Sequence, residues 1–106
     1  MSEQHYREAL KVVLEALALP HAATVGNEKI RAEILNLRLM HTVCFLERVL
    51  DDEAPWTDIP WSVGYLRERL AENPPVGYVT HEQAREALDQ GASWDEAVTP
   101  EGGWPA

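Results

Sequence analysis

The chain has 106 residues, of which 45% are apolar, and it carries 18 acidic against 9 basic side chains, a net charge of −9. This length excludes a multidomain protein, and the apolar fraction excludes a wholly disordered chain. We expect one small folded domain with a modest core, because a domain of this size buries only about two-thirds of its unfolded surface.

The first part of the chain predicts two helices. Ser2 can cap a helix over about residues 3–19, which Pro20 ends. Apolar side chains recur along one face of this helix, at Tyr6, Leu10, Val13 and Leu17. A longer helix is expected over about residues 28–50, with Asn27 as its cap, or with Thr24 if it begins one turn earlier.

This long helix has two apolar faces on a helical wheel. One pole carries Ile30, Ile34, Leu37, His41, Cys44 and Phe45, and the opposite pole carries Ala32, Leu35, Leu39, Val43, Leu46 and Leu50. Arg31 and Arg38 lie on one of the narrow polar edges between the poles. Both apolar faces are expected to be buried, either by the other helices in a monomer or by a second copy of the chain that packs along one face. We expect a homodimer, with Leu35, Leu39, Val43 and Leu46 as candidate interface residues.

A third helix is predicted over about residues 59–72, with Asp58 as its cap and Pro60 in its first turn. One face of this helix is aliphatic and carries Ile59, Val63, Leu66 and Leu70. Trp61 and Tyr65 lie nearly opposite, where they are candidate contacts for a protein partner, because Trp and Tyr bury large surfaces at interfaces.

The last part of the chain contains two capping boxes. Thr80 and Gln83 predict the start of a helix that ends before Gly91, and Ser93 and Glu96 predict a single further turn. No strand pattern is present, so the fold class is all-α: a small bundle of about four helices with a long central helix. We expect residues 1–98 to form a single helical domain and residues 99–106 a flexible, extended tail.

The negative charge is concentrated in the second half of the chain. Residues 1–50 carry six acidic and six basic side chains, whereas residues 71–106 carry seven acidic side chains and one basic one. Such a surface repels phosphate, so direct nucleic-acid binding is not expected, and the acidic segment after Ser93 is too short for a DNA-recognition helix. A protein partner with a basic surface is the simpler inference.

Targeting and redox signals indicate a cytoplasmic protein. The first residues lack the features of a secretory signal, and no apolar run is long enough to span a membrane. Cys44 is alone, so no intramolecular disulfide is possible. Seven Arg against two Lys suggest a bacterial or phage origin.

No catalytic motif emerges from the spacing of reactive residues. His41, Cys44 and Glu47 lie three residues apart on one helix, which leaves a metal or thiol site at His41 and Cys44 as an alternative. A metal site needs more ligands than this, and we expect a buried, inert Cys44 beside a buried His41.

We therefore expect a non-catalytic interaction or adaptor module that uses no cofactor. Its candidate contact residues are Trp61, Tyr65, Trp94 and Trp104. An alternative is an acidic decoy that occupies the basic groove of a nucleic-acid-binding protein in place of phosphates. The two differ in the salt dependence of partner binding.

Overall fold

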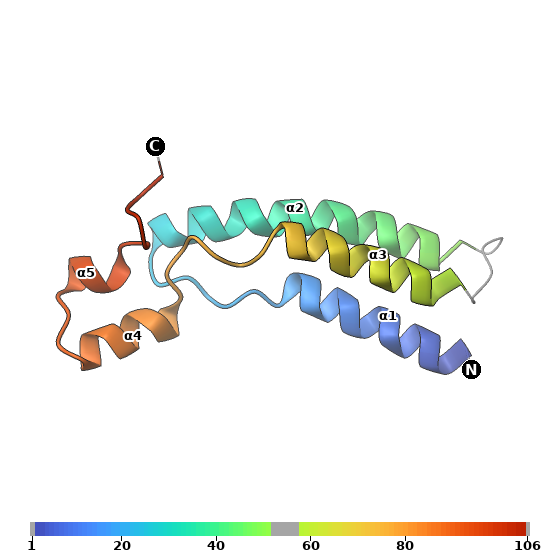
Figure 1. The fold of residues 1–106 in the computed structure, drawn as a ribbon, viewed down its shortest axis with the longest axis horizontal. Coiled ribbons are helices and arrows are strands. Elements are labelled where there is room, and N and C mark those ends of the chain that lie inside the picture. Colours follow the sequence, from blue (N-terminus) through green and yellow to red (C-terminus); the bar gives the residue numbers. More distant parts are fainter. Residues whose placement is uncertain (1, 52–57, 106) are drawn as a thin grey trace. The chain divides into compact units, whose positions relative to one another are not determined.

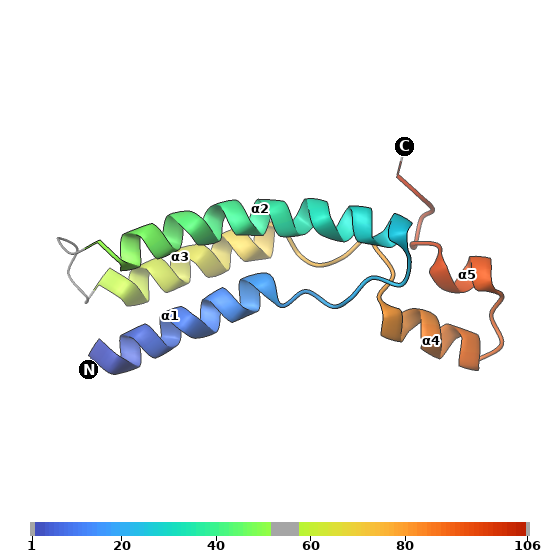
Figure 2. The same cartoon turned by 180° about the vertical axis from the view of Figure 1, so that it is seen from behind.

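A computed structural model describes residues 2–51 and 58–105, and these ranges contain five helices and no strand. The helices are α1 (Ser2–Leu17), α2 (Val25–Val49), α3 (Ile59–Glu72), α4 (His81–Asp89) and α5 (Trp94–Val98), drawn in Figure 1 and from behind in Figure 2. The expected all-α helical bundle is confirmed.

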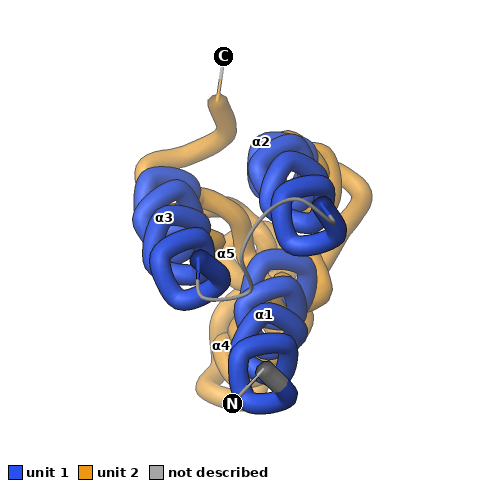
Figure 3. Tube along the Cα trace, turned by 90° about the vertical axis from the view of Figure 1, so that its right-hand side faces the viewer, with its two compact units in different colours: residues 1–18, 35–74 blue, residues 19–34, 75–106 orange. Residues whose placement is uncertain are grey.

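The chain divides into two compact units. Unit 1 comprises residues 1–18 and 35–74, and unit 2 comprises residues 19–34 and 75–106 (Figure 3). Helix α2 therefore contributes its first residues to unit 2 and the rest to unit 1.

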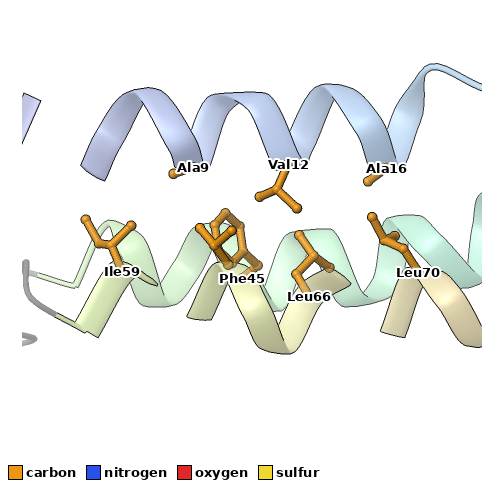
Figure 4. Packing of buried hydrophobic residues seen from close by; sticks show 8 residues of the cluster. Ala9, Val12, Ala16, Phe45, Ile59, Leu66 and Leu70 are labelled. Atoms are coloured by element: carbon orange, nitrogen blue, oxygen red, sulfur yellow. The ribbon is translucent and has the colours of Figure 1, made fainter. Parts of the chain in front are cut away.

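The core of unit 1 forms where α1, α2 and α3 meet. Its buried members are Ala9, Val12 and Ala16 of α1, Phe45 of α2, and Ile59, Val63, Leu66 and Leu70 of α3 (Figure 4). The four α3 residues are those on the predicted aliphatic face, so that face is confirmed. Helices α1 and α3 run in the same direction and α2 runs opposite to them (Figure 1).

Helix α1 buries a different face from the one predicted. Tyr6, Leu10 and Leu17 are exposed, and Ala9 and Ala16 are buried instead. The physical reason is size, because alanine side chains let two helix backbones come close together. Helices α1 and α3 pack along each other with many of their Cα atoms within 8 Å.

Helix α2 also turns an unexpected side inward. Arg38 and Thr42 are buried with Phe45, whereas Leu37 and Leu39, which belong to opposite apolar poles, are both exposed. The inward side is therefore the edge that carries Arg38, and the two apolar poles lie at its margins. An edge that the sequence indicates as polar and solvated is the buried one, because the arginine finds partners inside.

Those partners are backbone carbonyl groups at the C-terminal ends of α1 and α3. The Nε atom of Arg38 donates to the Asn73 oxygen at 2.8 Å, and Nη1 donates to the Glu15 and Ala16 oxygens at 3.1 and 3.4 Å. Nη2 donates to the Leu70 oxygen at 3.4 Å. The last carbonyl groups of a helix have no partner within the helix, so one guanidinium satisfies the ends of two helices.

An exposed ion pair also joins α1 to α3. Arg67 donates two hydrogen bonds to the Glu15 carboxylate, at 3.0 and 3.2 Å. These bonds lower the pKa of Glu15. Because the pKa is lower in the folded than in the unfolded chain, the pair stabilises the fold above the unfolded-state pKa, and this contribution disappears as the pH falls through the folded-state value.

In unit 2, the predicted capping boxes begin α4 and α5. Thr80 Oγ1 accepts from the Gln83 amide at 3.1 Å, and Gln83 Oε1 accepts from the Thr80 amide at 3.0 Å. Ser93 and Glu96 make the same pair of bonds. Hydrogen bonding to the Ser93 side chain, and then to its backbone amide, lowers the pKa of the Glu96 carboxyl. Gly91 follows α4 with a φ of 94°, as expected for the residue after a helix C-terminus.

The interior of unit 2 is small. Its buried members in α4 and α5 are Ala84, Ala97 and Val98. The segment before α2 pairs with the segment before α4 through a single antiparallel bridge between Ala22 and Thr80. The Tyr78 hydroxyl donates to the Pro20 carbonyl oxygen at 2.8 Å, which adds a second link between these segments.

Asn27 is buried within unit 2 and does not cap α2. Thr24 takes the capping position, since its Oγ1 accepts from the Asn27 amide at 3.3 Å and α2 begins at Val25. The Asn27 side chain donates to Thr24 Oγ1 and to the Val98 carbonyl oxygen, at 2.9 and 2.8 Å, and its Oδ1 accepts from the Val79 amide at 2.8 Å. One amide thus joins three segments.

Replacement of Arg38 by methionine should destabilise unit 1 strongly. The carbonyl groups at two helix ends lose their partner, so we expect the free energy of unfolding to fall by about 3 kcal/mol or more in urea denaturation. Arg7→Met is the matched control, since Arg7 is exposed on α1, and it should change the free energy by no more than about 0.5 kcal/mol. Equal effects of the two substitutions would contradict the role given to Arg38.

Replacement of Asn27 by alanine should loosen unit 2. The Val79 amide and the Val98 carbonyl lose a buried partner, which we expect to cost about 2 kcal/mol. Native-state hydrogen exchange tests this, because protection of the Val79 amide should drop. The control is Asn36→Ala, at an exposed position of the same helix. The prediction is wrong if Asn36→Ala lowers the protection of the Val79 amide as much as Asn27→Ala does.

Candidate functional site

A groove of about 240 Å³ lies between α2 and α3 in unit 1. Helix α2 contributes His41, Cys44, Phe45 and Arg48. Helix α3 contributes Trp61, Ser62, Tyr65 and Leu66. The groove therefore combines an aromatic wall, a thiol, an imidazole and a guanidinium.

The predicted contact residues Trp61 and Tyr65 form one wall of the groove. Their rings are stacked, with centroids 5.5 Å apart and planes inclined by 16°. The guanidinium carbon of Arg69 lies 5.0 Å from the centroid of the Tyr65 ring. Both aromatic residues nevertheless remain exposed, Trp61 at 67% and Tyr65 at 48%. Stacking thus orders two large rings that the rest of unit 1 leaves uncovered.

The expectation of a buried Cys44 is wrong, because the structure places it in an exposed position. Cys44 and the half-buried His41 both line the groove, so the structure brings together the two residues of the thiol alternative. Glu47 is not part of this lining. Among the described residues, no group of three or more His, Cys, Asp or Glu side chains is placed to hold a metal ion.

Ser62 is a groove residue that sequence reasoning missed. It is 5% exposed, and its hydroxyl has no hydrogen-bond partner within the described part of the chain. Its spacing was informative, because Ser62 lies three residues after Ile59 and four before Leu66, on the buried face of α3. A serine among aliphatic residues on such a face is a candidate polar contact in the groove.

The other two predicted contact residues lie in unit 2. Trp94 begins α5 and is 59% exposed. Trp104 is also exposed, and its ring lies so close to Gly26 that a Cβ atom at that position would be 3.0 Å from the ring. The glycine at this position therefore makes room for the indole.

The dimer-interface candidates lie on α2 in unit 1. Leu39 and Val43 are exposed, and Leu35 and Leu46 are half-buried, with Leu46 packed against the core. The groove lies where the opposite pole of α2 meets α3. Figure 3 shows α1 and α3 on different sides of α2. Because the opposite pole of α2 meets α3, we infer from the helical wheel that these four residues face the side nearer α1.

A second concave region, in unit 2, borders the first turn of α4. It is lined by Pro20, His21, Thr80, His81, Glu82 and Arg85. The His81 amide donates to the His21 carbonyl oxygen at 2.8 Å, so backbone pairing places these two histidines beside each other in space.

No helix in the described ranges combines the length and apolarity needed to cross a membrane. Comparisons of the chain with protein-family models, with curated proteins and with solved structures found no match.

Proposed function

We propose that this protein is a non-catalytic interaction module that binds a protein partner with a basic surface. The observation that carries the proposal is the Trp61–Tyr65 pair, two stacked and exposed aromatic rings on a packed helix. Aromatic side chains in such positions are frequent energetic anchors of interfaces, because they bury a large area and lose little conformational entropy.

Electrostatics supports a basic partner. In unit 2, six acidic side chains of residues 81–101 are exposed: Glu82, Glu86, Asp89, Asp95, Glu96 and Glu101. Arg85 is the one basic residue of the last 36 positions of the sequence, residues 71–106. A surface of this sign accelerates encounter with a basic protein. Exposed Trp94 and Trp104 are further candidate contacts in the same unit.

Substitution of the aromatic pair tests this function. We expect the double variant Trp61→Ala, Tyr65→Ala to release a basic protein that the wild type captures from the native host. Loss of an anchor residue typically weakens binding by about 2 kcal/mol, which corresponds to about thirtyfold in affinity. Val76→Ala, at another exposed apolar position, should retain it. The readout is quantitative mass spectrometry of the captured proteins.

The salt dependence of partner binding distinguishes this function from that of an acidic decoy. An aromatic-anchored partner should stay bound when the salt concentration is raised, whereas a decoy held by charge alone should lose its partner. Capture that is lost on raising the salt but is unaffected by the double substitution would refute the interaction module and favour the decoy.

We further propose that the molecule acts as a homodimer through α1 and α2 of unit 1. Support comes from an apolar stripe on α1, made by Tyr6, Leu10 and Leu14, all of which are exposed. This stripe adds to exposed Leu39 and Val43 on the side of α2 nearer α1. Exposed apolar surface of this extent favours an interface.

A single substitution on α2 should separate the copies. Leu39→Glu places a charge in the proposed interface, so we expect a monomer in sedimentation or light-scattering measurements at micromolar concentration. Leu37→Glu is the matched control, because Leu37 is on the same helix and has nearly the same exposure, 47% against 43% for Leu39, but points away from α1. A monomeric wild-type protein would contradict the proposal, and so would a Leu39→Glu variant that remains dimeric.

A further inference from the structure

We propose that the groove between α2 and α3 binds a small planar aromatic acid. The proposal goes beyond the interaction function, because it concerns a small molecule and can be tested with the purified chain and no protein partner. It rests on the size of the groove, the sign of its charge and one buried hydroxyl.

The size of the groove suits a single ring system. Its volume is about 240 Å³, and an apolar cavity of about 150 Å³ is enough to hold benzene. Phe45 and Leu66, both buried, supply apolar contacts, and Tyr65 offers a ring face for stacking. A flat ring carrying one short substituent fits this volume.

The charge of the groove favours an anion. Its eight lining residues include the guanidinium of Arg48 and no acidic residue, although acidic side chains outnumber basic ones two to one in the chain. Within residues 2–51 and 58–105, Arg48 pairs with Asp58, from Nη2 to Oδ2 at 3.3 Å, and both side chains of this pair are about half exposed. A guanidinium has five N–H donors, so Arg48 can pair with a ligand carboxylate as well.

Ser62 supplies the second polar contact. Its buried hydroxyl has no partner in the described part of the chain, and an unsatisfied buried hydroxyl is unfavourable. Rotation about one side-chain torsion redirects the oxygen, and the hydroxyl can then donate to or accept from a ligand atom. A bound acid would satisfy a group that the protein alone leaves unsatisfied.

Cys44 provides the readout, since it is the only cysteine of the chain, is exposed and lines the groove. The experiment measures the rate of Cys44 alkylation by iodoacetamide, from intact mass, as indole-3-acetate is added at constant pH and ionic strength. We expect the bound acid to slow alkylation about fivefold or more by covering the thiol. The alkylation rate of glutathione under the same conditions is the control for effects on the reagent.

Charge recognition is tested with indole-3-acetamide, which has nearly the same shape and no charge. We expect half-maximal protection by the acetamide to need about tenfold more ligand, the usual effect of losing one charge-assisted hydrogen bond. Arg48→Gln should abolish this preference for the acid, whereas the matched control Arg7→Gln, at an exposed position of α1, should keep it. Ser62→Ala should weaken the binding of both compounds, and circular dichroism would check that each variant is folded.

Three results would overturn the proposal. They are an alkylation rate that indole-3-acetate leaves unchanged at millimolar concentration, equal protection by the acid and the amide, and protection by a peptide ending in tryptophan but not by the free acid. None of them bears on capture of a protein partner, so failure of this proposal and failure of the interaction function are separate observations.

Discussion

Unit 1 depends on the contact between the Arg38 guanidinium and the carbonyl ends of α1 and α3. These two helices run in the same direction, so the negative ends of their dipoles lie near each other, where they repel. A buried cation between them offsets this repulsion and satisfies carbonyl groups that would otherwise lack partners. Arginine suits the position better than lysine, because its planar group donates in several directions at once. Thr42 binds the Arg38 carbonyl through its hydroxyl at 2.7 Å, so polar groups follow one another along the buried edge of α2.

Local signals predicted those elements that depend on neighbouring residues. The capping boxes at Thr80 and Ser93, the glycine after α4 and the aliphatic face of α3 are all confirmed, since each depends on residues within a few positions of one another. Trp61 and Tyr65 could be assigned to the exposed face of α3 for the same reason, because four residues of helix place two rings on one side. The exposed part of the candidate site was therefore predictable from spacing alone.

Burial of polar side chains was not predictable, because it depends on partners distant in sequence. Asn27 binds groups of Val79 and Val98, which no local pattern connects to it. Arg31 donates to the carbonyl oxygens of Leu19 and Pro20, which follow the end of α1. Arg38 donates to the Glu15 carbonyl oxygen in the last turn of α1. A helical wheel counts each of these residues as polar and assigns it to solvent, although an arginine or asparagine with enough partners can be buried at little net cost. Helix α1 shows the opposite case, in which apolar residues that a helical wheel assigns to the core are exposed. Close packing there buries alanine and leaves leucine outside.

The orientation of α2 about its own axis accounts both for the groove and for the apolar residues that α2 leaves exposed. Because the edge carrying Arg38 faces inward, the two apolar poles of α2 lie at the margins of the buried side. One pole meets α3, where His41, Cys44 and Phe45 line the groove. The other pole leaves Leu39 and Val43 exposed on the side nearer α1. If a leucine occupied position 38, α2 would gain apolar surface on its inner edge, but the carbonyl ends of two helices would lose their donor. The polar contact at the carbonyl ends of α1 and α3 thus determines which apolar side chains stay outside, and with them the surfaces available for binding.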